Sequence, residues 1–176
     1  MPRVSVRSLL LACLVVLPLV LSAADQRIVV FKAQRRLELL NGDKVAKTYR
    51  IGLGFAPTGP KTKQGDGRTP EGTYYVCVKN AHSQFTLSLG LSYPGPGDAA
   101  RGLTAGTITK AQHAAVVAAH KRRTTPPWNT GLGGEIFIHG KGSGSDWTLG
   151  CIALDDADIK ELFATIATGT VVEIRP

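Results

Sequence analysis

The sequence contains few cysteines, few aromatic residues and fewer acidic than basic residues. One of its three cysteines lies in an apolar N-terminal segment, so Cys77 and Cys151 can form one disulfide at most. This excludes the multiply bridged scaffold of small secreted domains. Charged residues make up 19% and hydrophobic residues 43% of the 176 residues, which excludes a disordered polar chain. The net charge of +8 is compatible with an anionic polymer as partner, but charge alone does not identify one.

Several signatures of enzyme classes are also absent. The chain has neither the Gly-x-Ser-x-Gly elbow nor the Ser-x-x-Lys motif of serine acyltransferases. It has no P-loop, and the glycine-rich segment 131–134 precedes an expected strand instead of linking a strand to a helix. No pair of cysteines or histidines has the spacing of a zinc site. We therefore expect no metal, no other cofactor and no nucleic-acid partner.

The longest apolar run is short and lies at the N-terminus. Residues 1–24 combine a basic start, an apolar run from Leu9 to Leu21 and small residues at the end, the three parts of a secretory signal. The run is shorter than a typical bilayer-spanning helix. A retained anchor and a lipid-attachment site at Cys13 are alternatives, although apolar residues follow Cys13 where a lipoprotein would turn polar. We expect a signal peptide at residues 1–24 and a single extracytoplasmic domain at 25–176.

Abundant glycine (20) and proline (10) predict many turns, and therefore short strands instead of long helices. Strands are expected at residues 28–31, 36–40, 45–51, 73–78, 85–91, 135–139 and 170–174. One helix is expected at 109–120, begun by a capping box, and another from 155 onward, ended by Gly169. Loops are expected at 52–72, 93–98 and 124–134. Cys77 lies in an expected strand, where a buried cysteine is ordinary.

The segment from His139 to Cys151 carries the strongest chemical signal. A histidine ends an expected strand, a glycine-rich loop reverses the chain, and a cysteine follows shortly before a helix. The loop is long enough to bring the thiol and the imidazole together, and an imidazole can activate a thiol as a nucleophile. Gly150 allows the backbone to approach a substrate carbonyl closely, and amides around Cys151 are candidates for an oxyanion hole. A chance pairing of the two residues is the alternative on spacing alone.

The joint pattern resembles the active-site signature of the YkuD-type L,D-transpeptidases. The signature is a His-Gly pair, a glycine-rich spacer and Ser/Thr-x-Gly-Cys-Ile/Val, here His139-Gly140, residues 141–147 and residues 148–152. Residues 65–74 and 91–94 resemble further segments of the family, and the likeness extends from about residue 28 to residue 174. The resemblance implies a mainly β, α+β fold: a curved, sandwich-like sheet with an inserted helix and one helix after the cysteine.

The resemblance also implies a function and a set of site residues. It implies a periplasmic cysteine acyltransferase that acts on peptidoglycan stem peptides, with Cys151 as nucleophile and His139 as base. The Gly140 carbonyl would orient the imidazole, and the Gly150 and Cys151 amides would form the oxyanion hole. The acyl acceptor would be another stem peptide, a lysine of a cell-wall-linked protein, or water. A cysteine hydrolase that releases murein linkages and a non-catalytic cell-wall-binding domain are the alternative functions.

One departure from the family pattern concerns substrate binding. Members commonly carry arginine two positions after the cysteine, where this chain has Ala153. A guanidinium can hold a carboxylate through paired hydrogen bonds, which alanine cannot. We expect Lys141 or Arg68 to supply the missing cation, with Lys141 preferred because it is two residues from His139. Thr148 of the motif completes the expected substrate-binding set.

Overall fold

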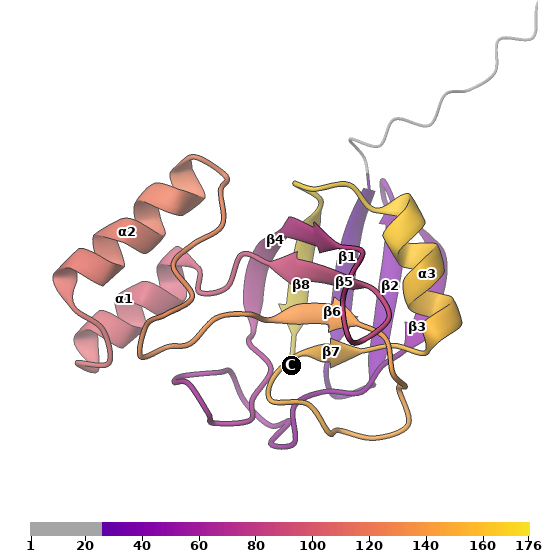
Figure 1. Cartoon of the computed structure of the whole chain (residues 1–176), viewed down its shortest axis with the longest axis horizontal. Coiled ribbons are helices and arrows are strands. Elements are labelled where there is room, and N and C mark those ends of the chain that lie inside the picture. Colours follow the sequence, from indigo (N-terminus) through magenta and orange to yellow (C-terminus); the bar gives the residue numbers. More distant parts are fainter. Residues whose placement is uncertain (1–25) are drawn as a thin grey trace, which may run out of the picture.

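The computed structural model describes residues 26–176, so the expected signal peptide and Cys13 lie outside the described residues. Figure 1 shows a strongly curled sheet, one helix packed on it and a pair of helices projecting from its side. In chain order, the elements are β1 (Gln26–Phe31), β2 (Arg36–Asn41), β3 (Lys44–Arg50), β4 (Gly72–Asn80), β5 (Ser88–Leu91), α1 (Pro96–Thr104), α2 (Lys110–Lys121), β6 (Phe137–His139), β7 (Ile152–Ala153), α3 (Asp156–Thr165) and β8 (Val171–Arg175). No helix within this part of the chain combines the length and apolar character needed to cross a membrane.

The sheet curls until its two outer strands approach each other. Its strand order is β3-β2-β1-β8-β4-β5-β6-β7, with β8 parallel to β1 and β7 parallel to β6. The segment that follows β3 then reaches β7, because Gly52 forms a bridge with Ala153 and Gly54 forms a bridge with Thr148. The sheet is therefore close to a half-barrel, and the chain just before the cysteine is joined to the N-terminal hairpins.

The core fills the inside of this curled sheet, and α3 covers it. Alternating residues of β1, such as Ile28 and Val30, are fully buried, as are Ile138 of β6 and Ile152 of β7. Helix α3 presents the apolar face that its periodicity predicts, with Ile159 and Leu162 buried among these side chains and Ile166 just beyond its end. The mainly β fold with one helix after Cys151 is therefore confirmed.

The insertion between β5 and β6 contains two helices, where one was expected. The prediction of α2 is confirmed, and its capping box is formed by Thr109 and Gln112, whose side chains accept each other's backbone N–H groups. The prediction of turns at 93–98 is wrong in its second half, because α1 begins at Pro96. Proline is well suited to a first helical turn, where its missing N–H has no partner to lose, and Asp98 accepts the Gly95 N–H at 2.8 Å.

Three expected boundaries are also corrected. The strand predicted to begin at residue 85 begins at Ser88, because Thr86 has a positive φ of 74° and the chain turns there. The strand predicted from residue 135 begins at Phe137, because Glu135 has a φ of 54°. Helix α3 ends at Thr165 instead of near Gly169, since Ile166 is already extended. The two-residue strand β7 was not predicted from the sequence.

Candidate active site

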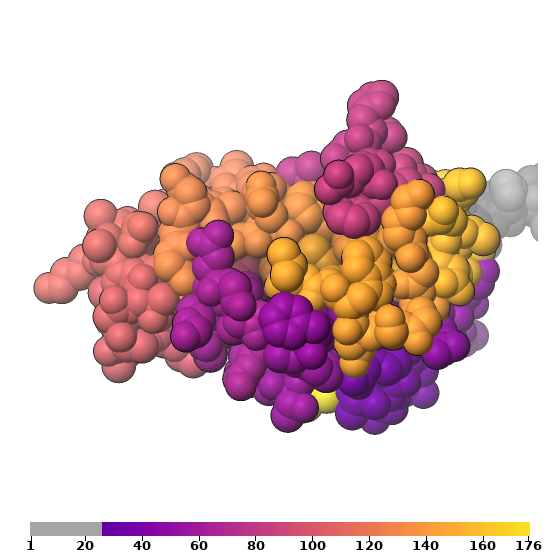
Figure 2. Space-filling view, turned by 60° about the horizontal axis from the view of Figure 1, so that its bottom comes forward, coloured from indigo at the N-terminus to yellow at the C-terminus, as the bar shows by residue number. Residues whose placement is uncertain are grey.

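A cavity of about 900 Å³ opens at the end of the sheet where β6 and β7 lie side by side. Four segments line it: the loop after β3, the connection between β4 and β5, the segment leading into β6, and the loop between β6 and β7. In Figure 2 the β4–β5 connection stands out as a magenta projection above the orange segments around β6 and the violet loop after β3. Cys151 and His139 both line this cavity.

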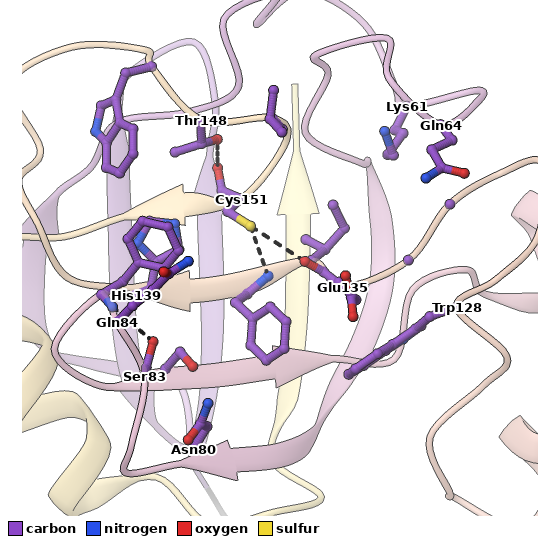
Figure 3. Close-up of a pocket in the computed structure, with 18 of the residues that line it drawn as sticks. Lys61, Gln64, Asn80, Ser83, Gln84, Trp128, Glu135, His139, Thr148 and Cys151 are labelled. Carbon is purple, nitrogen blue, oxygen red and sulfur yellow. Dashed lines mark hydrogen bonds between the residues drawn. The ribbon is translucent and has the colours of Figure 1, made fainter.

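Strand pairing places the cysteine and the histidine on one face of the sheet. Ile138 pairs with Ile152 and His139 with Ala153, so Cys151 lies next to Phe137, two residues along the strand from His139. Because side chains alternate between faces, the two isoleucines enter the core while the thiol and the imidazole share the opposite face. Two residues of strand span about 7 Å, so the pair are diagonal neighbours. Figure 3 shows both side chains at the cavity, with the thiol nearer to Glu135.

His139 is held from three directions. Its Nδ1 lies 2.7 Å from the Gly140 carbonyl oxygen, which can only accept, so Nδ1 carries the proton and Nε2 is the free base. The ring of Phe85 stacks on the imidazole at 4.5 Å, and the Trp147 ring meets it edge-on at 5.6 Å. His139 is 2% exposed. Burial lowers the pKa of His139 below its ordinary value, although the Gly140 carbonyl raises it in part.

Cys151 is held more loosely. Its thiol accepts the Phe137 N–H at 3.4 Å and donates to the Glu135 carbonyl at 3.5 Å, both long contacts (Figure 3). Burial raises the pKa of the Cys151 thiol; the Phe137 N–H and the Lys61 ammonium lower it, and the Glu135 carboxylate raises it further. The resting pair is therefore a neutral thiol beside a neutral imidazole. Cys151 and Cys77 are both free within residues 26–176.

The turn before the cysteine is shaped by Thr148 and Gly150. The Thr148 hydroxyl donates to the Cys151 carbonyl at 2.8 Å and accepts the Gly150 N–H at 3.1 Å. Gly150 has a φ of 131°, and a Cβ there would lie 2.6 Å from the Arg68 carbonyl oxygen, so the position requires glycine. Within residues 26–176, the Gly150 amide is thus already engaged, whereas the Cys151 amide donates to no other protein group. Of the two expected oxyanion donors, the Cys151 amide is the free one.

The loop between β6 and β7 is anchored to the turn between β1 and β2. Arg35 binds Asp146 through Nε at 2.9 Å and Nη2 at 2.6 Å, and Asp146 also accepts the Leu53 N–H at 3.0 Å. At the other end of the loop, Asp155 accepts the Ser143 N–H at 2.9 Å. These bonds fix the backbone that carries Trp147 and Cys151, although Arg35 and Asp146 do not line the cavity.

The cations expected to replace the missing arginine lie elsewhere. Lys141 is exposed and Arg68 supports Gly150 through its backbone, and neither side chain lines the cavity. Ala153 is fully buried in its pair with Gly52. A Cβ on Gly52 would lie 3.8 Å from that of Ala153 and 2.2 Å from the Ser145 carbonyl oxygen, so the loop covers this pair. A long side chain at position 153 would displace the loop that carries the cysteine.

The cation that does line the cavity is Lys61, which was not predicted from the sequence. Its ammonium donates to Asp66 at 2.8 Å and to the Lys63 carbonyl at 3.0 Å, and its side chain is 3% exposed. Burial opposes ionisation of Asp66, but Lys61 and neighbouring backbone N–H groups hold the pKa of Asp66 down to about 2. Phe85 was likewise not predicted as a site residue. Lys61 comes from the loop after β3, and Phe85, which was expected to begin a strand, comes from the connection between β4 and β5.

Within residues 26–176, no group of three or more histidine, cysteine, aspartate or glutamate side chains is placed to hold a metal ion. The ionisable groups at the cavity instead surround a single thiol. Their arrangement suits nucleophilic attack by sulfur on a carbonyl carbon, with proton transfer at Nε2 of His139. A general base and a free backbone amide beside a nucleophile are the parts that acyl transfer requires.

Comparisons with known proteins agree with this geometry. Residues 25–174 match the YkuD family, the L,D-transpeptidase catalytic domain. The search of curated proteins found no match. Among solved structures, the helical cell shape determining protein Pgp2 from Campylobacter jejuni has a TM-score of 0.60 and 22% identity, over 85% of this chain and 47% of that chain. Bd1075 from Bdellovibrio bacteriovorus has a TM-score of 0.55 and 21% identity, over 86% and 48%.

An L,D-transpeptidase from Mycobacterium smegmatis has a TM-score of 0.50 and 10% identity, over 86% of this chain and 59% of that chain. This chain therefore spans about half to three fifths of the length of these three structures. At such low identities, the similarity to these structures shows a common fold.

Proposed function

The chain belongs to the YkuD family of L,D-transpeptidase catalytic domains, and on this premise we propose that it is a cysteine acyltransferase acting on peptidoglycan stem peptides. The observation that carries the proposal is the shared cavity: Cys151 and His139 lie on one face of the sheet and open into the same space of about 900 Å³. That volume is within the range of sites that enclose a small ligand.

In the first half-reaction, the Cys151 sulfur attacks the carbonyl carbon of the peptide bond between meso-diaminopimelate and a terminal D-alanine. Nε2 of His139 takes the thiol proton, and the Cys151 amide stabilises the oxyanion. The C–N bond then breaks, and the imidazolium gives its proton to the departing D-alanine amine. A thioester between Cys151 and the peptide remains.

In the second half-reaction, an amine attacks the thioester and His139 removes its proton. The new amide forms as the sulfur leaves and recovers a proton from the imidazolium. The Gly140 carbonyl keeps the reactive tautomer in place throughout, at 2.7 Å from Nδ1, a backbone counterpart of the acid in other catalytic triads. If water attacks instead, the same residues perform hydrolysis.

We place the activity in the periplasm, on the basis of the N-terminal signal-like segment and the family's action on the cell wall. One of the similar structures suggests a more specific role: Pgp2 is described as a helical cell shape determining protein. We accordingly propose that this chain modifies the wall in a way that affects cell shape. Deletion of its gene should then change cell outline together with the muropeptide profile.

The decisive experiment incubates the purified protein with tetrapeptide muropeptides and identifies the products by mass spectrometry. A new cross-linked dimer supports transpeptidation, and loss of D-alanine without cross-linking supports the hydrolase alternative. An unchanged substrate supports the non-catalytic alternative. Cys151→Ala should abolish product formation. Cys77→Ala is the matched control, because Cys77 lies in β4, does not line the cavity and should be dispensable for activity.

A further inference from the structure

The charges that line the cavity are unequally compensated. Within residues 26–176, its lining contains two fully charged side chains, Lys61 and Glu135. Lys61 is neutralised by Asp66 in a pair whose side chains are 3% and 7% exposed. Glu135 is exposed and has no ion-pair partner among the described residues. In a chain of net charge +8, the cavity therefore presents one uncompensated negative charge.

This carboxylate is attached close to the nucleophile. The backbone carbonyl of Glu135 accepts the Cys151 thiol proton at 3.5 Å, so its side chain starts within reach of the reacting atoms. Figure 3 shows Glu135 and His139 on opposite sides of Cys151. The carboxylate raises the pKa of the thiol and thus opposes the thiolate that catalysis needs. A negative charge at this position therefore disfavours formation of the thiolate unless a cation binds beside it.

The hydrogen bond that the Glu135 carbonyl accepts from the thiol does not explain why the side chain at this position is a glutamate. The Glu135 φ of 54° lies in the left-handed region, which glycine adopts without strain and glutamate adopts rarely, and the two preceding residues are both glycine. Glycine at position 135 would supply the same carbonyl without strain and without the opposing charge. Left-handed backbone is common at functional positions, although Arg35, Thr86, Arg123 and Lys141 also adopt it here, so it does not by itself distinguish Glu135. The side chain, and not the backbone, therefore requires an explanation.

We propose that Glu135 is a specificity-determining residue that binds the free ammonium group of the stem peptide's diamino acid. The inference rests on the proposed function and deepens it. Diaminopimelate carries such an ammonium on its side chain in both the acyl donor and the acyl acceptor. In the acceptor the same nitrogen is the attacking group, so it must first give one proton to solvent and attack the thioester as the neutral amine. When the donor binds, its ammonium supplies the positive charge that the cavity lacks, and the thiolate forms beside a neutral ion pair. Substrates whose amine is acetylated lose this contact.

The donor arm of the test measures binding to protein carrying Cys151→Ala, so that no reaction occurs. The ligands are the tetrapeptide with a free diaminopimelate amine and the same peptide with that amine acetylated. Acetylation should weaken binding about fivefold, the size of a partly exposed ion pair, and Glu135→Gln should remove the difference. Asp43→Asn is the matched control: it removes the same charge from an exposed hairpin turn and should keep the difference.

The acceptor arm uses the acetylated peptide as donor to active protein and adds an acceptor peptide with a free amine. If Glu135 serves the acceptor, Glu135→Gln should raise the acceptor KM about fivefold and shift products from cross-link to hydrolysis. Glu135→Asp, which keeps the charge, should recover part of the loss. An effect in either arm supports the proposal and says which peptide supplies the ammonium.

Equal binding of the free and acetylated peptides, together with an unchanged acceptor KM in Glu135→Gln, would overturn the inference while leaving the proposed function intact. If neither peptide binds or reacts with any variant, both the inference and the proposed function are contradicted. A separate measurement needs no peptide: Glu135→Gln should speed alkylation of Cys151 by iodoacetamide near neutral pH, whereas Asp43→Asn should not. An unchanged alkylation rate would contradict the opposing charge on which the inference depends.

Discussion

The two reacting side chains lie in contrasting surroundings. The imidazole of His139 is fixed by a 2.7 Å hydrogen bond and by aromatic rings on two sides. The thiol of Cys151 has two contacts of 3.4 and 3.5 Å and follows a glycine with a φ of 131°. The proposed base is therefore pre-oriented, while the proposed nucleophile keeps freedom to move toward a carbonyl carbon.

The difference has a physical reason. A general base must present one nitrogen in one tautomer, and every degree of misorientation reduces proton transfer. The sulfur must instead travel from its resting contacts to bonding distance of the substrate, so tight hydrogen bonds would hold it back. The hydrogen bond and the aromatic rings therefore hold His139, the residue that does not have to move in the proposed reaction. Changes on the histidine side and the cysteine side should accordingly produce different kinetic signatures.

The largest effect is expected on the histidine side itself. His139→Ala removes the imidazole that shares a face of the sheet with Cys151 and should lower kcat/KM about a thousandfold, as loss of a general base does. Steady-state assays of D-alanine release measure this. His82→Ala, His113→Ala and His120→Ala should each keep most of the activity of the folded protein. Retained activity in His139→Ala, with another histidine essential, would show that the base has been misassigned.

The next effect concerns the rings that hold the imidazole. Phe85→Ala or Trp147→Ala should lower kcat about tenfold by loosening the base. Each opens the imidazole to water, so the pKa of His139 should rise toward its ordinary value and the acid limb of the kcat/KM profile should move to higher pH. The pH dependence of kcat/KM tests this. Phe55→Ala is the control, since Phe55 is 55% exposed and outside the cavity lining.

A smaller effect is expected on the cysteine side. Lys61→Met removes a positive charge that lowers the pKa of the thiol, so alkylation of Cys151 near pH 8 should slow about threefold. Because the single variant leaves Asp66 without its partner, Lys61→Met combined with Asp66→Asn should be measured beside it. Lys63→Met, in the same loop but exposed, should have no effect. Unchanged alkylation in both Lys61 variants would remove Lys61 from the electrostatics of the thiol.

The smallest effect is expected at Lys141, the cation that the sequence favoured. Its side chain is exposed and outside the cavity, so Lys141→Ala should change the KM for an anionic stem peptide less than twofold. The amidated peptide serves as the uncharged comparison. A KM increase limited to the anionic peptide would show that Lys141 takes part in substrate binding and would contradict this prediction.

The sequence was informative where local patterns decide the structure. The hairpins, α2 and the apolar face of α3 follow from turn residues, capping and periodicity. The His139 and Cys151 pair followed from a strand, a glycine-rich loop and a recognisable motif. Helix α1 was missed because its prolines and glycines suggest turns, although Pro96 and Asp98 together start a helix.

The remaining site residues depend on contacts between distant segments. Lys61 reaches the cavity through the loop after β3, and Phe85 reaches His139 across the β4–β5 connection. No spacing in the sequence encodes either contact. The same applies to Ala153. Its small size is explained by the Ser145 backbone, which covers the pair that Ala153 forms with Gly52. Contacts between distant segments, and not local propensity, therefore determine which residues occupy these three positions.

The position of β8 has a consequence for how the protein is made. This strand contains residues 171–175, yet it lies between β1 and β4 in the middle of the sheet. His139 and Cys151 are therefore synthesised before β8, the strand that joins the two halves of the sheet. Such distant pairings close slowly, because a large loop must be ordered first. A chain cut before Val171 would retain His139 and Cys151 but lack the strand that joins β1 to β4, so we expect it to be unable to fold the proposed site.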